Sequence, residues 1–440
     1  MKKIKSRAYF SMLIALGLVF GLSIFVVRLY THGKDWTMLR ANQSVFNEGV
    51  LDTGKVVDRN GVVLASAGNG VFSYAEDATV RAACLHAVGD FAGNIGSGAL
   101  TAFDFKLAGY DFVEGVASIS GDGGKVKLSI DSTLNAIAYK ALNGRRGAVL
   151  VSNYKTGEIL CMVSSPSYDP SDPPDLTSTK YEGVFMNRCL GATYTPGSVF
   201  KLVTLCAAIE NIPDLYTRTF TCTGSVNVGG DTVHCTGVHG QQTIEQALAN
   251  SCNSAFSEIS QELGADTIDQ YAEKFGLLSS HEISGISTAA GSIQKAEADT
   301  SNLSWMGIGQ YNDLICPAAM LRFVSAIAND GVAKEPVLLK NGGSSSTRLI
   351  DAATAEKVQA LMSYNVAYAY GQSQFPNLKI CAKTGTAEVG DGTSHAWFVG
   401  FLDDAENPLA FTVIIENGGG GLANAGPVAN AVLQAAVGNT

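Results

Sequence analysis

The sequence predicts an α+β fold, in which a five-stranded antiparallel sheet with flanking helices and a helical subdomain follows one transmembrane helix and a small β-rich pedestal. Three observations predict it. Residues 8–27 carry no charge. Residues 31 to about 120 contain short extended runs broken by Gly and Asp. From about residue 125 onward, extended runs lie near both ends of the segment, with long apolar helical runs between them.

This interpretation divides the chain into four segments. They are a cytoplasmic tail at residues 1–7, a transmembrane anchor at 8–28, a pedestal or linker at 29–122, and a main domain at 123–440. With 440 residues, 46% of them hydrophobic, the chain can bury a sizeable core without disulfide bonds. The Gly-rich run 121–124 is the expected hinge into the main domain.

The anchor is predicted from length and from its flanking charges. Residues 8–27 are long enough to cross a hydrocarbon core of about 30 Å. Four basic residues precede them and place the N-terminus inside: Lys2, Lys3, Lys5 and Arg7. The alternative is a cleavable signal peptide, but residues 28–32 offer no small-x-small cleavage site. We therefore expect a retained single-pass anchor in the cell membrane with the main domain outside the cytoplasm.

The charge balance excludes nucleic acid as a partner. The chain has 30 Lys and Arg against 40 Asp and Glu, and four of the basic residues precede the anchor. The remainder is therefore strongly acidic and would repel phosphate backbones. The six histidines are scattered, and no Cys or His residues show the paired spacing of metal ligands, so we expect no metal site. The sequence also lacks a phosphate-binding Gly loop, so we expect no cofactor.

Alternating patterns place the secondary structure. Asn60-Gly61, between two apolar runs, predicts a hairpin in the pedestal. The five strands and the closing helix of the main domain are predicted at 147–154, 158–164, 380–387, 396–401, 409–416 and 427–437.

The first candidate catalytic element is Ser198 with Lys201. Thr195-Pro196 predicts a helix that begins just before Ser198 and continues through an apolar segment to Glu210. Residues three apart share a helical face, so the Lys201 amine can reach the Ser198 hydroxyl. Serine needs a base, and lysine can act as one where burial or a second cation lowers its pKa. Ser292 and Lys295 have the same spacing but lie in a polar stretch that we interpret as a solvated loop.

The second element is Ser251-Cys252-Asn253, at the junction of two helical stretches. In the catalytic interpretation, Ser251 relays a proton to a leaving amine and the Asn253 amide holds a substrate peptide. The alternative is that the three residues only cap a helix. Ser225-Val226-Asn227 repeats the spacing in a Gly- and Thr-rich excursion and is not a candidate.

The third element is the run Lys383, Thr384, Gly385 and Thr386 on the strand predicted from Ile380. Here an extended peptide can lie beside the strand edge, Gly385 allows close approach, and Lys383 can attract a carboxylate. The backbone N–H groups of Thr386 and Ser198 can form an oxyanion hole. The run 155–157 has the same Lys-Thr-Gly sequence but lies in a predicted hairpin turn.

Nine cysteines are an odd number for a disulfide framework. Cys222 and Cys235 flank a Gly-rich stretch that can form a hairpin, so a disulfide between them stays open beside burial as small apolar residues. Cys252 and Cys381 lie beside candidate catalytic residues, where oxidation or buried packing are both possible.

The three elements, in this order, resemble the active site of penicillin-binding proteins and serine β-lactamases. A wider resemblance to class B penicillin-binding proteins covers nearly the whole chain. It comprises the anchor and residues 58–61, 155–160, 165–170, 307–310, 328–331 and 394–398.

The resemblance implies a serine D,D-transpeptidase of cell-wall synthesis. Ser198 is then expected to attack the bond between the two terminal D-alanines of a peptidoglycan stem peptide, with Lys201 as the first general base. The acyl group passes to a neighbouring amine, and penicillin and other β-lactams acylate the same serine. The family also implies a membrane glycosyltransferase as partner.

Two positions depart from the family pattern, Thr53 in place of Arg and Tyr311 in place of Gly. They put in doubt the packing of the pedestal and of the loop beside the site. His395 and Trp397 invite catalytic roles, but on a strand next to that of Lys383 we expect them to support it from behind.

Two other functions share the same acylation site. A β-lactamase would hydrolyse the acyl-enzyme rapidly, and the anchor and pedestal favour a transpeptidase over it. A β-lactam sensor or scaffold would be acylated without turnover, and it would signal through a partner helix, because seven residues precede the anchor. The acyl acceptor, the stem-peptide variant, the oligomeric state and a role in elongation, division or sporulation stay open.

Overall fold

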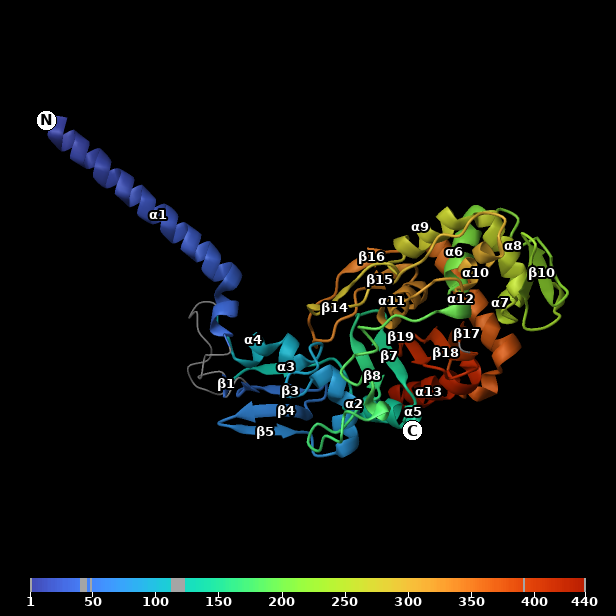
Figure 1. Cartoon of the computed structure of the whole chain (residues 1–440), viewed down its shortest axis with the longest axis horizontal. Helices are drawn as coiled ribbons and strands as arrows, with labels where there is room; N and C mark the ends of the chain where they lie inside the picture. Colours follow the sequence, from blue (N-terminus) through green and yellow to red (C-terminus); the bar gives the residue numbers. More distant parts are fainter. Residues whose placement is uncertain (1, 40–45, 48–49, 112–122, 391, 439–440) are drawn as a thin grey trace.

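The computed structural model describes residues 2–39, 46–47, 50–111, 123–390 and 392–438. Helix α1 (Lys2–Thr37) projects away from the rest of the chain, and a small four-stranded sheet lies near its C-terminal end (Figure 1). Within the described residues, the segment Lys3–Gly33 is the one helical stretch long and apolar enough to cross a membrane. None of its most apolar 18-residue window is buried inside the protein, as expected for a helix that faces lipid.

The small sheet has the strand order β5-β4-β3-β6. Its strands are β3 (Lys55–Val57), β4 (Val63–Gly68), β5 (Val71–Tyr74) and β6 (Lys125–Lys127). β3 and β4 form the hairpin predicted at Asn60-Gly61, with Val57 opposite Val63 and Gly61 at φ +92°, which Gly adopts without strain. β6 pairs in parallel with β3, so the chain beyond residue 122 still contributes to this sheet. The division at 122/123 stays a prediction, and part of the expected hinge lies outside the described residues.

Short elements complete this region and the connections around the main domain. They are β1 (Phe46–Asn47), β2 (Val50–Leu51), α2 (Ala78–Val88), α3 (Ala99–Ala102), α4 (Asp104–Leu107), β9 (Phe220–Cys222), β10 (Ser225–Val228), β11 (Asp231–His234), β12 (Gly240–Gln242), β13 (Glu282–Ile283), β14 (Ile286–Ser287), β15 (Val332–Lys334) and β16 (Ser346–Arg348).

The predicted five-stranded antiparallel sheet is confirmed, with the order β17-β18-β19-β7-β8. Its strands are β7 (Gly147–Asn153), β8 (Ile159–Ser165), β17 (Ile380–Val389), β18 (Thr393–Leu402) and β19 (Leu409–Ile415). Strands from the two ends of the domain meet where β19 pairs with β7. β17 is therefore an edge strand, and β17 and β18 are longer than predicted because their hairpin pairing continues to Val389 opposite Thr393.

Helices cover both faces of this sheet. Along β7, Val149 and Val151 pack on the side of α5 (Ser132–Leu142) and α13 (Gly421–Ala436), whereas Ala148 and Leu150 pack on the opposite side. That opposite side carries the helical subdomain of Figure 1: α6 (Lys201–Asn211), α7 (Ile244–Ala249), α8 (Asn253–Leu263), α9 (Ala265–Lys274), α10 (Ser301–Ile308), α11 (Pro317–Ala328) and α12 (Ala352–Asn365). The alternation along β7 matches the period of two expected of a strand buried on both faces.

The closing helix was predicted to begin at Pro427, and that boundary is wrong by six residues. α13 begins at Gly421 and contains Pro427 in its interior. Leu422 and Ala425 already pack into the core beneath the sheet, so burial holds the first turns in helical form despite the proline.

A buried carboxylate joins the pedestal hairpin to the main domain. Asp58 is fully buried, and its Oδ1 accepts hydrogen bonds from the N–H groups of Asn60 and Val62, at 2.8 and 2.9 Å. Its Oδ2 accepts from the backbone N–H and the hydroxyl of Ser132, at 3.2 and 2.8 Å, at the first residue of α5. One side chain thus fixes the turn against the start of a helix that supports the sheet.

Asp58→Ala is expected to lower the free energy of unfolding by about 3 kcal/mol, because it leaves buried donors without an acceptor. Thermal and urea denaturation of the detergent-solubilised chain measure the effect. Asp403→Ala, at an exposed position, is the matched control and should change stability by less than about 0.5 kcal/mol. Equal stability of the two variants would contradict the proposed connection.

Candidate active site

The three predicted elements converge on the hydroxyl of Ser251. Lys201 Nζ, at the start of α6, lies 3.3 Å from Ser251 Oγ. Lys383 Nζ, on β17, lies 3.1 Å from the same oxygen. Segments separated by 50 and 132 residues therefore meet at one side chain. Ser251 itself has φ +52°, a left-handed conformation that non-glycine residues seldom adopt, and such conformations cluster at functional sites.

Lys201 is held by three contacts. Its amine donates to the Ser251 carbonyl at 2.7 Å and to Asn253 Oδ1 at 2.8 Å, in addition to the contact with the Ser251 hydroxyl. A neutral amine has two N–H groups, which serve the Ser251 carbonyl and Asn253 Oδ1, and its lone pair then faces the Ser251 hydroxyl, which can pass it a proton. The Asn253 Nδ2 donates at 2.9 Å to the His234 carbonyl. The Asn253 amide, expected to hold substrate, thus holds Lys201 and a neighbouring loop.

Burial controls the charge of both lysines. Both side chains are fully buried. Desolvation lowers the pKa of Lys201 from 10.5 to about 7, although the nearby Cys252 and Cys235 oppose the shift. Desolvation also lowers the pKa of Lys383 well below its usual value, and the charge of Lys201 lowers it further. The apolar helix predicted around residues 201–210 thus provides the expected low-pKa amine through burial.

The buried position of Lys383 differs from the sequence expectation. We expected a charged amine that attracts a substrate carboxylate, but the Lys383 amine donates to Thr384 O at 2.9 Å and lies beside Ser251. Its burial favours the neutral form. In this structure the Lys383 amine therefore lies within hydrogen-bond distance of the Ser251 hydroxyl, and the expected contact with a substrate carboxylate stays a prediction.

Ser198 lies on the 3₁₀ turn Gly197–Val199, immediately before α6. The predicted helix thus begins with a tighter turn, because Gly197 at φ +55° donates its N–H to Gly309 O at 2.8 Å. Ser198 is partly exposed, unlike its buried neighbours Gly197 and Val199. Ser198 is therefore partly accessible at a turn that leads into the buried part of α6.

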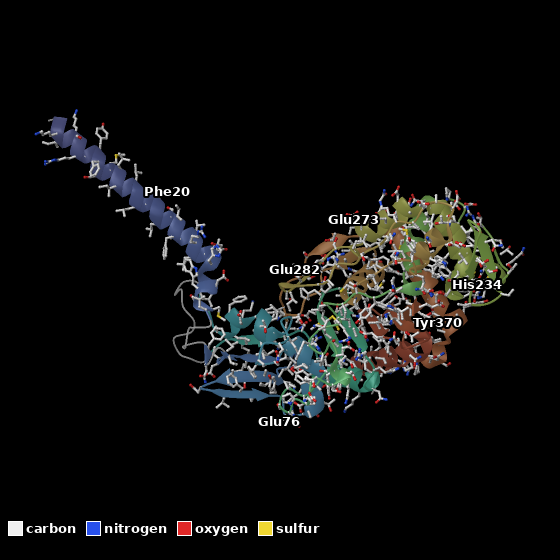
Figure 2. The ribbon with its side chains drawn as sticks, viewed as in Figure 1. Phe20, Glu76, His234, Glu273, Glu282 and Tyr370 are labelled. Carbon is white, nitrogen blue, oxygen red and sulfur yellow. The ribbon has the colours of Figure 1, made fainter. Side chains whose placement is uncertain are left out.

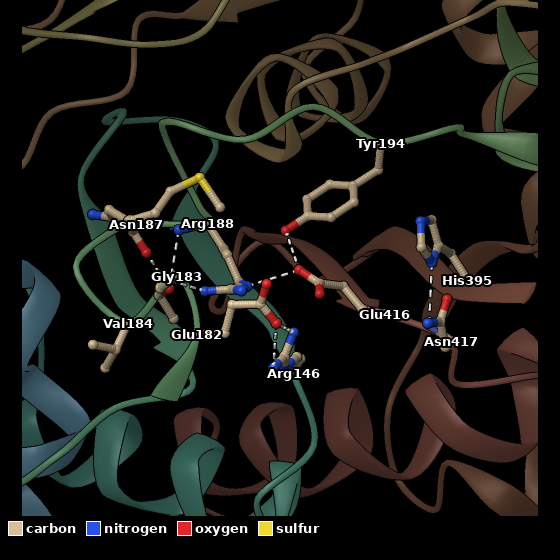
Figure 3. A network of polar contacts seen from close by, with 12 residues as sticks. Arg146, Glu182, Gly183, Val184, Asn187, Arg188, Tyr194, His395, Glu416 and Asn417 are labelled. Carbon is tan, nitrogen blue, oxygen red and sulfur yellow. Dashed lines mark hydrogen bonds and ion pairs between the residues drawn. The ribbon is translucent and has the colours of Figure 1, made fainter. Parts of the chain in front are cut away.

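A polar network fixes the segment before Ser198. Figure 3 shows Tyr194 and Arg188 directed at Glu416, and each donates to Glu416 Oε1 at 2.7 Å. Trp397 Nε1 donates to Thr195 O at 2.9 Å. Trp397 lies opposite Gly385 of β17, as expected of a residue that supports this strand, and its indole N–H also holds the segment before Ser198. In the same view, the Asn417 N–H donates to His395 Nδ1 at 3.1 Å.

Gly385 brings this segment close to β17. A Cβ at Gly385 would lie 2.9 Å from Pro196 O and 3.1 Å from both Trp397 Cβ and Val199 Cγ1. The missing side chain thus allows close approach of the Ser198 turn, where we expected close approach of a substrate peptide.

The outer edge of β17 leaves the predicted oxyanion donor in place. The Thr384 N–H donates to the Tyr370 hydroxyl at 3.1 Å, and the Glu388 N–H donates to Gln310 Oε1 at 2.9 Å. Both N–H groups therefore point away from β18. Alternation along a strand directs the Thr386 N–H to the same edge, between these two capped positions. The geometry agrees with an oxyanion hole that uses Thr386.

Gln310 is a supporting residue that site reasoning from the sequence missed. Its Oε1 accepts from the Glu388 N–H, and its Nε2 donates to Glu388 O at 3.3 Å. The side-chain amide therefore pairs with the backbone at the outer edge of β17, as a neighbouring strand would. The carbonyl of the preceding residue, Gly309, accepts the hydrogen bond from the Gly197 N–H. The only signal was that Gly307-Ile308-Gly309-Gln310 belongs to the family resemblance. Tyr311, which departs from the pattern, packs partly buried against the core.

The repeated motifs lie outside this site. Lys295 is exposed and pairs with Asp266 and Asp269, at 3.0 and 2.9 Å. Lys155 lies in the hairpin turn and donates to Asn329 Oδ1 at 2.8 Å. Burial beside a second amine separates the candidate lysines from these copies.

The cysteines form no disulfide among the residues that the structure describes, so the bond weighed between Cys222 and Cys235 is not formed. Cys381 is buried, and burial raises its pKa to about 12, which favours packing over oxidation. Cys222, Cys235, His239 and Cys252 instead gather in one group, with ligand atoms within 4.8 Å of one another. The sequence analysis expected no such cluster.

Comparison with known proteins gives the family. Residues 147–434 match the family model described as penicillin binding protein transpeptidase domain. The chain belongs to this family. It is 27% identical over 382 residues to peptidoglycan D,D-transpeptidase PbpA of Mycobacterium tuberculosis, and the match covers 77% of each chain. It is 30% identical over 344 residues to stage V sporulation protein D of Bacillus subtilis, covering 70% of this chain and 52% of that one.

Solved structures agree. The ceftriaxone acyl-enzyme complex of penicillin-binding protein A from M. tuberculosis has a TM-score of 0.75 and 26% identity, covering 88% of this penicillin-binding chain and 98% of the other. A D,D-transpeptidase domain from Eggerthella lenta has a TM-score of 0.72 at 26% identity, covering 88% and 98%. The resemblance inferred from the sequence motifs is confirmed.

Gly385→Ala is expected to lower the free energy of unfolding by about 1–3 kcal/mol, because its Cβ would force the Ser198 turn away from β17. Differential scanning calorimetry measures the change. Gly390→Ala is the matched control, since a Cβ there meets nothing within 4 Å. An equally stable Gly385→Ala variant would show that the turn does not depend on this approach.

Proposed function

We propose that the chain is a peptidoglycan D,D-transpeptidase in which Ser198 is the acylated nucleophile. The observation that carries the proposal is the shared contact of two fully buried lysines with Ser251, where one of the two, Lys201, begins the helix that follows the Ser198 turn. Its relatives include named peptidoglycan D,D-transpeptidases and β-lactam acyl-enzyme complexes. The substrate class is a stem peptide ending in two D-alanines.

In the first half-reaction, Ser198 Oγ attacks the carbonyl carbon of the penultimate D-alanine. Its proton passes to the neutral amine of Lys201, whose lowered pKa suits a base near neutral pH. The oxyanion lies between the N–H groups of Ser198 and Thr386. When the C–N bond breaks, the terminal D-alanine takes a proton from Lys201 through Ser251 and leaves.

In the second half-reaction, an amine of a neighbouring stem peptide attacks the Ser198 ester. The amine loses a proton to the Lys201–Ser251–Lys383 group, and Ser198 Oγ recovers one as the ester bond breaks. The acyl donor lies along the outer edge of β17, beside Thr384 and Thr386, as an added extended strand. Proton count and charge are restored, so the protein begins the next cycle unchanged.

The site is also expected to work at a membrane surface. The chain is a single-pass membrane protein by its apolar α1 and its family. We propose that the basic residues before α1 keep the N-terminus inside and place Ser198 outside the cytoplasm. We further propose a membrane glycosyltransferase as the partner that supplies glycan strands.

Penicillin G is expected to add its mass to the wild-type chain and to give no adduct with Ser198→Ala. Intact-protein mass spectrometry measures the adduct. Ser292→Ala is the matched control, because Ser292 is the exposed copy of the motif, and it should label like wild type.

Three outcomes would contradict the proposal. An adduct that persists in Ser198→Ala would place the nucleophile elsewhere. Rapid penicillin hydrolysis with no lasting adduct would favour a β-lactamase. Stable labelling without D-alanine release from a stem-peptide mimic would favour a sensor or scaffold.

The acylation rate constant is expected to rise about tenfold per pH unit below pH 7 and to level off above it, because the neutral form of Lys201 is the base. Stopped-flow reaction with a fluorescent penicillin measures the profile. Lys201→Arg keeps the charge but cannot give up its proton, so it should be inactive throughout this range. A flat wild-type profile would exclude Lys201 as the base.

A further inference from the structure

Four potential metal ligands surround the backbone that carries Ser251. Cys222 ends β9, Cys235 follows β11, His239 precedes β12, and Cys252 lies between Ser251 and Asn253. The β10–β11 hairpin, in which Ser225 pairs with His234, brings the first two cysteines together. In Figures 1 and 2 this excursion lies at the far end of the molecule from α1, near α7 and α8, with His234 labelled on it.

The distances fit a tetrahedral metal site. Cys235 Sγ lies 3.8 Å from Cys252 Sγ and 3.6 Å from His239 Nδ1. A tetrahedral Zn²⁺ with bonds of about 2.3 Å to sulfur and about 2.0–2.1 Å to nitrogen separates two sulfurs by about 3.8 Å, and sulfur from nitrogen by about 3.5–3.6 Å. A disulfide would need about 2.05 Å between sulfurs. The cluster therefore has the spacing of ligands around an ion, not of a cystine.

Backbone and hydroxyl donors surround the sulfurs. The N–H groups of Asn253 and Ala255, in the first turn of α8, donate to Cys235 Sγ at 3.2 Å and to Cys252 Sγ at 3.5 Å. The Ser254 hydroxyl lies 3.5 Å from Cys222 Sγ. Such donors stabilise thiolate ligands and orient them around a metal. They come from the helix that begins at the catalytic Asn253.

The donor set selects the ion. Three thiolates and one imidazole suit Zn²⁺, whereas Mg²⁺ and Ca²⁺ need oxygen ligands. Four protein ligands fill a tetrahedral zinc site, which is the arrangement of structural sites rather than of catalytic ones. Two of the ligands, Cys222 and Cys252, are buried, and Cys235 and His239 are half-buried. Such a site can take up an ion from the surface side.

We propose that Cys222, Cys235, His239 and Cys252 bind one Zn²⁺, which fixes Ser251 and Asn253 in position against Lys201. Cys252 is joined to Ser251 and Asn253 by peptide bonds. A bond from its sulfur to the zinc ion therefore restrains the backbone of both residues from one side. The His234 carbonyl, next to Cys235, accepts from Asn253 Nδ2 at 2.9 Å and restrains it from the other. The metal site itself is independent of the catalytic proposal, and its effect on acylation rests on that proposal.

Zinc content tests the metal site. The full-length chain, purified in detergent, is analysed by inductively coupled plasma mass spectrometry. About one zinc per chain is expected for wild type, with at least a tenfold loss in Cys235→Ser. Cys84→Ala, at a buried cysteine on α2, should keep the zinc. Cys235→Asp should also keep it, because a carboxylate can replace the thiolate as a zinc ligand.

Two results would overturn the metal site. One is wild-type protein without zinc whose cysteines are free or joined by a Cys235–Cys252 disulfide, as seen by thiol alkylation and peptide mapping. The other is equal zinc content in wild type and Cys235→Ser. Iron or copper in place of zinc would also contradict the ion assignment.

Removal of zinc from the wild-type chain tests its effect on the site without any substitution. A chelator is expected to lower the second-order rate constant for penicillin acylation by about tenfold or more, and added Zn²⁺ should restore it. Cys84→Ala, which lies outside the metal site, should stay within about threefold of wild type. Unchanged acylation after zinc loss would overturn the positioning role. Zinc-loaded wild type that is never acylated would instead refute the catalytic proposal, so the two failures are distinguishable.

Discussion

The site depends on the burial of two amines around one hydroxyl. Lys201 and Lys383 are fully buried, and both contact Ser251 Oγ. Two ammonium groups that contact the same hydroxyl in a low-dielectric interior would repel each other strongly. The site therefore favours protonation states in which at least one of the two lysines is neutral. The protein thus obtains a base near neutral pH from a residue that is normally protonated. The cost of burying both amines is offset by the hydrogen-bond acceptors that Ser251, Asn253 and Thr384 supply.

The burial of both lysines requires close packing between β17, the edge strand of the sheet, and the turn that leads into α6. Gly385 and Gly197 permit the contact, Trp397 and Gly309 hold the turn, and Gln310 caps the edge strand beyond Thr386. Because β17 has a partner on one side only, its other edge keeps a backbone donor for the reaction. An inner strand could not provide it, since both of its edges are used in pairing. The position of β17 in the sheet order is therefore a condition of the chemistry.

Local pattern made much of this predictable. The five strands follow from alternation, and the low-pKa lysine follows from the apolar surroundings of residues 201–210. The full burial of Lys383 beside Ser251 was not predicted, because a sequence shows which residues share a strand but not which side chain becomes buried beside another amine. Pro427 was placed at the helix start by local preference, yet packing of Leu422 and Ala425 extends α13. Trp397 lies 202 residues from its acceptor Thr195, a contact that only the folded chain reveals.

The cysteine cluster shows the same limit from another side. Its ligands are separated by 13, 4 and 13 positions, without the short paired spacing that marks many zinc sites. Three of the nine cysteines join a histidine, and the other six are each buried. Six thiols are thus shielded by packing, and in the proposed site the other three share one ion, so an odd number of cysteines needs no unpaired reactive thiol. The number of cysteines alone therefore does not predict disulfides, because burial and the grouping of ligands also decide what each thiol does.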